Sequence, residues 1–281
     1  MAEPAQGGPA AAWITAHLTD FVPAGRGRAR VKPLWELAMV HTYLAQWSSG
    51  QRALEGWGTF LRQQCAAEGV LHEARFDRRN GLYLMQPYAW LRAGGQRDAA
   101  CEQVIRQLWR AGAQPTSVGQ VHSLWKAGFI PRTPDFDGFC RKQVLGRRWS
   151  DPALTRATYR ITHAVFYATD LGGRPASLDA AERRAVGAVL RRAARLAHDI
   201  GHWDRMIECS LALRALGERD LDWTAERGAD GAVPRERSVR SVTFADCYHS
   251  TLADLMLTAH RTLCPPDAPE RPLDVRERVH G

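Results

Sequence analysis

Six polar residues recur at long, similar intervals along the chain, and proteins use residues of these types to transfer protons or to bind metals. Consecutive members lie 36 to 45 residues apart, and they are His41, Gln86, His122, His163, Glu208 and His249. Imidazole and carboxylate groups ligate transition metals, and they also act as general acids and bases near neutral pH. The spacing therefore predicts a metal centre or a metal-free acid–base site.

The two versions of this site use overlapping residues. In the first, a divalent transition metal, zinc or iron, is held by His41, His163, Glu208 and His249. In the second, no metal is bound. The catalytic groups in either version are His163, Glu208, His122, Lys126 and Tyr167. A third interpretation is a purely structural network of hydrogen-bonded histidines, because buried polar groups must be paired. No HExxH motif supports the metal independently.

One of the repeat residues, Gln86, and residues about one helical turn from the repeat positions are expected to bind the substrate. They are Trp90, Gln86, Tyr83, Arg160, Asp204 and Asp246. Trp90 offers a flat wall, while Arg160 and nearby helix N-termini favour an anionic group. Asp204 and Asp246 could instead pair with Arg160 or Arg205. Lys126 could serve as a base or nucleophile, or pair with a carboxylate.

A sequence repeat positions these residues. The segment from His41 to Arg52 superposes without gaps on the segment from Gln86 to Arg97, and both end in Gly-Gln-Arg. Glycine follows the polar residue by nine positions in four copies, at Gly50, Gly95, Gly172 and Gly217. Apolar residues recur with helical periodicity around each copy, so each glycine suits a helix C-cap. Ser150-Asp151-Pro152 should begin a helix that runs to about Thr169.

Six partner segments are expected to form outer helices. They are Pro9–Phe21, Arg52–Glu68, Arg97–Ala111, Asp135–Leu145, Leu178–His198 and Arg219–Arg227. Six inner and six outer helices make six hairpins, which resemble the (α/α)6 toroid of terpene cyclases, lanthionine-forming cyclases and many glycosidases. An open solenoid and a closed ring both fit such a repeat. The resemblance implies the ring, so the predicted fold is all-α, with residues 1–264 closed into a single toroid domain. The proline-rich end, 265–281, is expected to be a disordered tail.

One segment carries a more specific resemblance. Residues 162–172 read Thr-His-Ala-Val-Phe-Tyr-Ala-Thr-Asp-Leu-Gly, which resembles a THxxFYxTDxG signature in uncharacterised actinobacterial proteins, some from specialised-metabolite gene clusters. The resemblance implies a role in natural-product biosynthesis, but it does not indicate which reaction the protein would catalyse. Asp170 follows His163 by seven residues, about 10 Å along a helix, so Asp170 is expected to order the helix end.

Composition limits the remaining possibilities. The 281 residues carry a formal net charge of +8, but only three of the 38 basic residues are lysine, which indicates codon bias rather than a nucleic-acid surface. The arginine run Arg183–Arg195 is interpreted as a solvated helix face. Six scattered cysteines form no CxxC pair. No apolar run is long enough to span a membrane, so a cytoplasmic protein is expected.

The sequence thus favours a biosynthetic enzyme that acts on a small polar or anionic substrate at a central His/Glu site. The reaction could be cyclisation, elimination or hydrolysis, by a lyase, cyclase or hydrolase with or without metal. The basic surface could recruit an acidic carrier protein or a partner enzyme, whereas neither nucleic acid nor membrane is an expected partner. The alternative is a non-catalytic binding or partner protein that uses the toroid as a scaffold.

Overall fold

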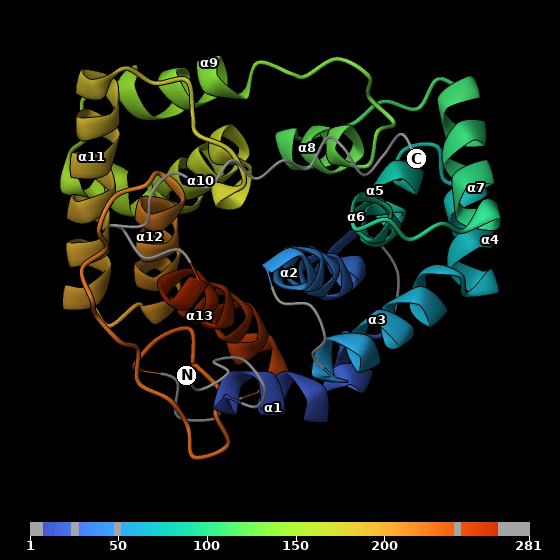
Figure 1. Cartoon of the computed structure of the whole chain (residues 1–281), viewed down its shortest axis with the longest axis horizontal. Helices are drawn as coiled ribbons and strands as arrows, with labels where there is room; N and C mark the ends of the chain where they lie inside the picture. Colours follow the sequence, from blue (N-terminus) through green and yellow to red (C-terminus); the bar gives the residue numbers. More distant parts are fainter. Residues whose placement is uncertain (1–7, 24–27, 48–51, 239–242, 264–281) are drawn as a thin grey trace. The chain divides into compact units, whose positions relative to one another are not determined.

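The computed structural model describes residues 8–23, 28–47, 52–238 and 243–263, and every regular element within them is helical (Figure 1). The predicted all-α fold class is therefore confirmed, while closure into a toroid stays a prediction. No helix in these residues is long and apolar enough to cross a membrane. Gly50 and the predicted disordered tail, 265–281, lie outside the described residues.

The chain forms two compact units, each assembled from several stretches of sequence. Unit 1 comprises Met1–Pro134, Arg227–Arg235 and Val239–Met256, and unit 2 comprises Asp135–Glu226, Glu236–Ser238 and Leu257–Gly281. The long last helix, α13 (Phe244–Leu263), begins in unit 1 and ends in unit 2.

Unit 1 is built on the packing of α2 (Lys32–Trp47) against α6 (Gln86–Ala93) and of α6 against α8 (Val118–Lys126). Apolar side chains spaced three and four residues apart on α2, such as Leu34, Leu37 and Ala38, are fully buried. The other helical elements of the unit are α1 (Pro9–Ala16), η1 (Leu18–Phe21), η2 (Arg28–Val31), α3 (Arg52–Cys65), α4 (Glu68–Phe76), α5 (Gly81–Leu84) and α7 (Ala99–Arg110).

Unit 2 is built on three helices that pack on one another, α10 (Asp151–Thr169), α11 (Ala180–Asp199) and α12 (Trp203–Ala215). A capping box between Asp179 and Glu182 begins α11, and one apolar stripe of α11 is buried. Its arginines lie off that stripe at exposed or half-buried positions, as predicted, and Arg192 pairs with Asp151. The smaller elements are α9 (Phe136–Cys140), η3 (Arg141–Leu145) and η4 (Asp170–Gly172).

All six predicted inner helices are present, as α2, α6, α8, α10, α12 and α13. Pro87 lies in the first turn of α6, where its missing N–H removes no helical hydrogen bond. Gly95, Gly172 and Gly217 all have positive φ angles, 91°, 90° and 79°, which confirms their predicted left-handed conformation.

The sixth outer segment was predicted wrongly. Residues 219–227 form no helix. Asp222 has a left-handed φ of 53°, and the buried carboxylate of Asp220 accepts a 2.7 Å hydrogen bond from Nε of Arg261. Residues 219–227 therefore form an irregular segment, which is held in place by contacts with the end of α13.

The end of α10 is an unusual left-handed turn. Asp170, Leu171 and Gly172 have φ angles of 49°, 53° and 90° in succession, and Asp170 is the C-cap residue of α10. A Cβ atom on Gly172 would lie 2.6 Å from Nε2 of His260. Only glycine therefore fits both the backbone conformation and the contact.

Replacing Gly172 should measure this packing. Gly172→Ala must adopt a strained φ and displace the buried His260 ring, so we expect a loss of about 1–3 kcal/mol in the free energy of unfolding. Gly217→Ala is the matched control, because Gly217 has a similar φ with nothing within 4 Å of its Cβ position. Urea denaturation should show the larger loss for Gly172→Ala, and equal losses would contradict the contact with His260.

His260 should make the stability of the protein depend on pH. Burial, assisted by the nearby Arg214 guanidinium, lowers the pKa of His260 from 6.5 to about 4. Between these values the unfolded chain binds the proton and the folded chain does not, so stability is complete above pH 6.5 and falls as the pH drops toward 4. The expected loss is about 3 kcal/mol. Unfolding measured at pH 7 and pH 5 should show a smaller difference for His260→Gln, and an unchanged difference would refute the assignment.

Candidate functional site

The six polar repeat residues all lie on helices, and they are divided between the two units. Unit 2 holds His163 on α10 and Glu208 on α12, whereas unit 1 holds His41, Gln86, His122 and His249. Each unit therefore has its own set of polar contacts.

One polar contact in unit 2 joins His163 to Glu208. Nε2 of His163 lies 3.5 Å from Oε1 of Glu208, and the two side chains are 40% and 4% exposed. The second oxygen of Glu208, Oε2, accepts a 2.5 Å hydrogen bond from Oγ1 of Thr162. A carboxylate fixed inside the unit thus holds an imidazole that is accessible from solvent.

A second polar contact lies one helical turn earlier. Oη of Tyr159 donates a 2.5 Å hydrogen bond to Oδ2 of the buried Asp204. Burial, together with the neighbouring Asp204 carboxylate, raises the pKa of Tyr159 well above its ordinary value, so the phenol keeps its proton. The Arg205 guanidinium lies over the Tyr159 ring, 5.5 Å from its centroid.

The two contacts join residues that are the same number of positions apart in the sequence. Tyr159 and Asp204 are 45 residues apart, as are His163 and Glu208. Each contact joins α10 to α12, and both helices advance by one turn between the contacts. The two helices therefore run parallel, and the predicted 45-residue repeat places equivalent residues side by side in unit 2.

The solvent side of His163 carries other predicted residues. Tyr167, one turn later on α10, contacts the His163 ring edge-on at a centroid distance of 6.0 Å. Arg160 is exposed on the preceding turn, and its guanidinium lies 5.9 Å from the centroid of the Trp149 ring. Residues three and four apart are neighbours on a helix surface, so Arg160, His163 and Tyr167 share one face.

Each of the two predicted aspartates accepts a hydrogen bond from a hydroxyl group. Oδ2 of Asp204 accepts from Tyr159. In unit 1, Oδ2 of Asp246 accepts a 2.6 Å hydrogen bond from Thr243. The Arg160 and Arg205 guanidiniums lie over the rings of Trp149 and Tyr159.

In unit 1 most predicted site residues are packed in the interior. Gln86 and His122 are 0% and 1% exposed. Nε2 of Gln86 lies 3.3 Å from Oγ of Ser123, and the His122 ring packs on Trp90 at a centroid distance of 5.6 Å. Nζ of Lys126 lies over the ring of Tyr43, 5.6 Å from its centroid. These contacts pack Gln86 and His122 into the interior of the unit.

Three other predicted site residues of unit 1, two histidines and a tyrosine, each contact a different partner. His41 turns toward α3, where its Nε2 lies 3.0 Å from the carbonyl oxygen of Leu54, and burial lowers its pKa. Nε2 of His249 lies 3.6 Å from Oε1 of Glu36. Tyr83 contacts Trp35 edge-on, at a centroid distance of 5.9 Å.

Two residues of these contacts were missed by the sequence analysis. Thr162 directly precedes His163 in the signature segment, and its hydroxyl fixes Glu208. Glu36 is 7% exposed on α2, on the side of the helix that also carries the buried Val40 and Tyr43. A carboxylate in a helix with apolar residues on several sides was the available signal, because a buried ionised group requires a partner.

Of the four predicted metal ligands, the structure shows one pair in contact. His163 and Glu208 lie together in unit 2, whereas His41 and His249 lie in unit 1, each with another partner. Among the described side chains, no three His, Cys, Asp or Glu residues are close enough together to hold a metal ion. Metal binding by the full set stays a prediction.

Comparison with known proteins places the chain in a family. A model described as a domain of unknown function, DUF6895, matches residues 7–259. The chain belongs to this family. No curated protein and no solved structure gives a significant match. The DUF6895 match extends from the residues before α1 into α13, so it includes the polar contacts of both units.

The Tyr159–Asp204 contact predicts a stability effect in this DUF6895 member. Tyr159→Phe removes the phenolic donor and leaves a buried carboxylate oxygen without it, so we expect a loss of about 1–3 kcal/mol in the free energy of unfolding. Tyr167→Phe is the control on the same helix. Urea denaturation near neutral pH should rank Tyr159→Phe as clearly less stable, and a wild-type midpoint for that variant would argue against the hydrogen bond.

Proposed function

We propose that the chain is an enzyme of small-molecule biosynthesis in which His163, held by Glu208, transfers a proton to or from a polar or anionic substrate. The observation that carries this proposal is the asymmetry of the pair, since the imidazole is 40% exposed and its carboxylate only 4% exposed. An accessible imidazole oriented by a buried carboxylate is the arrangement that general acid–base catalysis requires.

The surrounding residues support a defined role for each nitrogen of the ring. With Nε2–H directed at Glu208, the lone pair of Nδ1 accepts the substrate proton, and the imidazolium that forms is stabilised by the adjacent carboxylate. Thr162 donates a hydrogen bond to the other oxygen of the same carboxylate, Oε2 of Glu208. Arg160, on the same face of α10, supplies positive charge for an anionic substrate.

The reaction class follows from what the pair can do. Cyclisation, elimination and hydrolysis each need a proton to be moved at one atom, and His163 provides this function in all three. The five described cysteines are buried, so none offers an accessible thiol as a nucleophile. We also propose that the chain closes into an (α/α)6 toroid and is located in the cytoplasm. Its substrate would be either free or tethered to a carrier protein.

A divalent zinc or iron ion belongs to the second version of this proposal. The His163 and Glu208 side chains offer a nitrogen and an oxygen ligand of the types such ions prefer. Elemental analysis of the untagged wild type and of the His163→Ala/His249→Ala double variant separates the metal-dependent enzyme from the metal-free one.

A non-catalytic scaffold is favoured by a different observation, the burial of Gln86 and His122 at 0% and 1% exposure. At these two repeat positions the polar residue serves the interior of unit 1. If His163 has the same role, its replacement should change the melting temperature rather than turnover.

The test compares variants incubated with a small-molecule extract of the cells that carry the gene. Mass spectrometry should reveal ions that the wild type consumes, and His163→Gln should consume them at least about 100-fold more slowly. Glu208→Gln should also slow turnover, because it removes the charge that stabilises the imidazolium.

His198→Gln is the matched control. The His198 side chain is also 40% exposed and lies 3.6 Å from a carboxylate, but that carboxylate, on Asp199, is 72% exposed. We expect wild-type turnover from this variant. Equal turnover by wild type and His163→Gln, with melting temperatures unchanged, would refute catalysis by this pair.

A further inference from the structure

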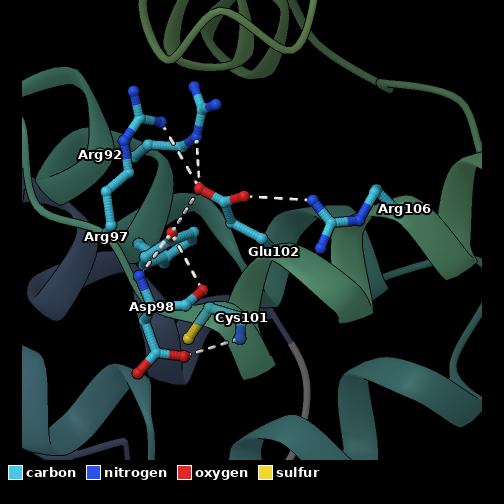
Figure 2. Close-up of polar contacts among 7 residues, drawn as sticks. Arg92, Arg97, Asp98, Cys101, Glu102 and Arg106 are labelled. Atoms are coloured by element: carbon cyan, nitrogen blue, oxygen red, sulfur yellow. Dashed lines mark hydrogen bonds and ion pairs between the residues drawn. The ribbon is translucent and has the colours of Figure 1, made fainter.

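Three arginines of unit 1 converge on one carboxylate (Figure 2). Nε of Arg92, on α6, and Nη1 of Arg97, in the following loop, lie 3.0 and 3.4 Å from Oε1 of Glu102. Nη1 of Arg106 lies 3.1 Å from Oε2 of the same residue on α7. Since Arg92 and Arg97 share one oxygen atom, their guanidinium groups must lie close together, as the figure shows.

The charges in this cluster do not balance. Three guanidinium groups against one carboxylate leave a formal surplus of two positive charges. Within the described residues, no other carboxylate pairs with Arg92, Arg97 or Arg106. Each guanidinium has five N–H donors, and Glu102 accepts from only one nitrogen of each group. Most donors of the cluster are therefore left for another acceptor.

The cluster is held in place before any ligand arrives. The Arg92 guanidinium lies over the Phe129 ring, 4.4 Å from its centroid, and its side chain is only 18% exposed. Oη of Tyr88 donates to the carbonyl oxygen of Asp98 at 3.2 Å, and Asp98 caps α7 by accepting from the Cys101 amide at 2.8 Å. Burial alone would raise the pKa of Glu102, but hydrogen bonds from Arg92 and Arg106 lower it. Glu102 therefore stays ionised.

We propose that Arg92, Arg97 and Arg106 form a binding site for the phosphoryl group of a small molecule. Adjacent guanidinium groups bind phosphate oxygens through paired N–H donors, and the surplus of two charges matches a phosphate dianion. Arg97 and Arg106 are 54% and 52% exposed, so the site is open to solvent. This site stands independently of the proton-transfer role of His163.

Inorganic phosphate is the probe for this site. Calorimetric titration at pH 8, where phosphate is dianionic, and at constant ionic strength should show binding to the wild type. Arg97→Gln/Arg106→Gln should weaken binding at least about tenfold, because each lost charged hydrogen bond costs about that much. Both side chains are more than half exposed, so the variant should remain folded.

Arg184→Gln/Arg195→Gln is the matched control, since it changes the net charge equally. Both residues are exposed on α11, and neither has an ion pair within the described part of the chain. We expect wild-type affinity for phosphate. A loss of affinity equal to that of Arg97→Gln/Arg106→Gln would show that only net charge matters and would overturn the proposal, as would a wild type that binds no phosphate.

Glu102→Gln separates a ligand site from a purely structural network. If the arginines bind phosphate, removing the competing carboxylate should tighten phosphate binding several-fold, and phosphate should raise the melting temperature of this variant more than that of the wild type. If the arginines serve only to pair with Glu102, the variant is destabilised and phosphate does not restore it. Binding to phosphatidylglycerol vesicles without binding to free phosphate would contradict a small-molecule ligand.

Discussion

Two buried carboxylates on α12 determine the geometry of unit 2. Asp204 and Glu208 are one turn apart and 2% and 3% exposed, so each needs donors that the interior must supply. Tyr159, Thr162 and His163 supply them from α10. Because both contacts must form together, α10 and α12 are fixed parallel and in register. The accessible imidazole is therefore positioned by the same contacts that stabilise the unit.

Much of this arrangement could be predicted because helix signals are local. Proline and capping residues begin helices, glycine ends them, and apolar periodicity marks the buried face. All six inner helices follow from those signals, as do the left-handed glycines 95, 172 and 217. The repeat also predicts which residues of α10 and α12 are equivalent, since parallel neighbouring copies place equivalent residues side by side. That reasoning placed His163 and Glu208 in one predicted site, and the two side chains are in contact.

The rest depends on contacts between distant parts of the chain, which local patterns do not encode. His41 shares its repeat position with His163, yet it faces the Leu54 carbonyl of α3. His249 is paired with Glu36, more than two hundred residues earlier. The segment 219–227 has residues that suit a helix, but the Asp220–Arg261 contact and the φ of Asp222 hold it as an irregular loop. A repeat thus specifies helical position better than it specifies the partner of each side chain.

The two polar clusters of the molecule differ in how their charges are balanced, and this difference decides what each can do. Glu208 lies beside His163, whose charge can change with a proton, so their contact suits proton transfer. Glu102 has three arginine partners, which remain charged at any physiological pH, so their surplus can be neutralised only by another anion. Burial explains why the carboxylates are ordered, but the identity of the cations around them separates acid–base chemistry from anion binding.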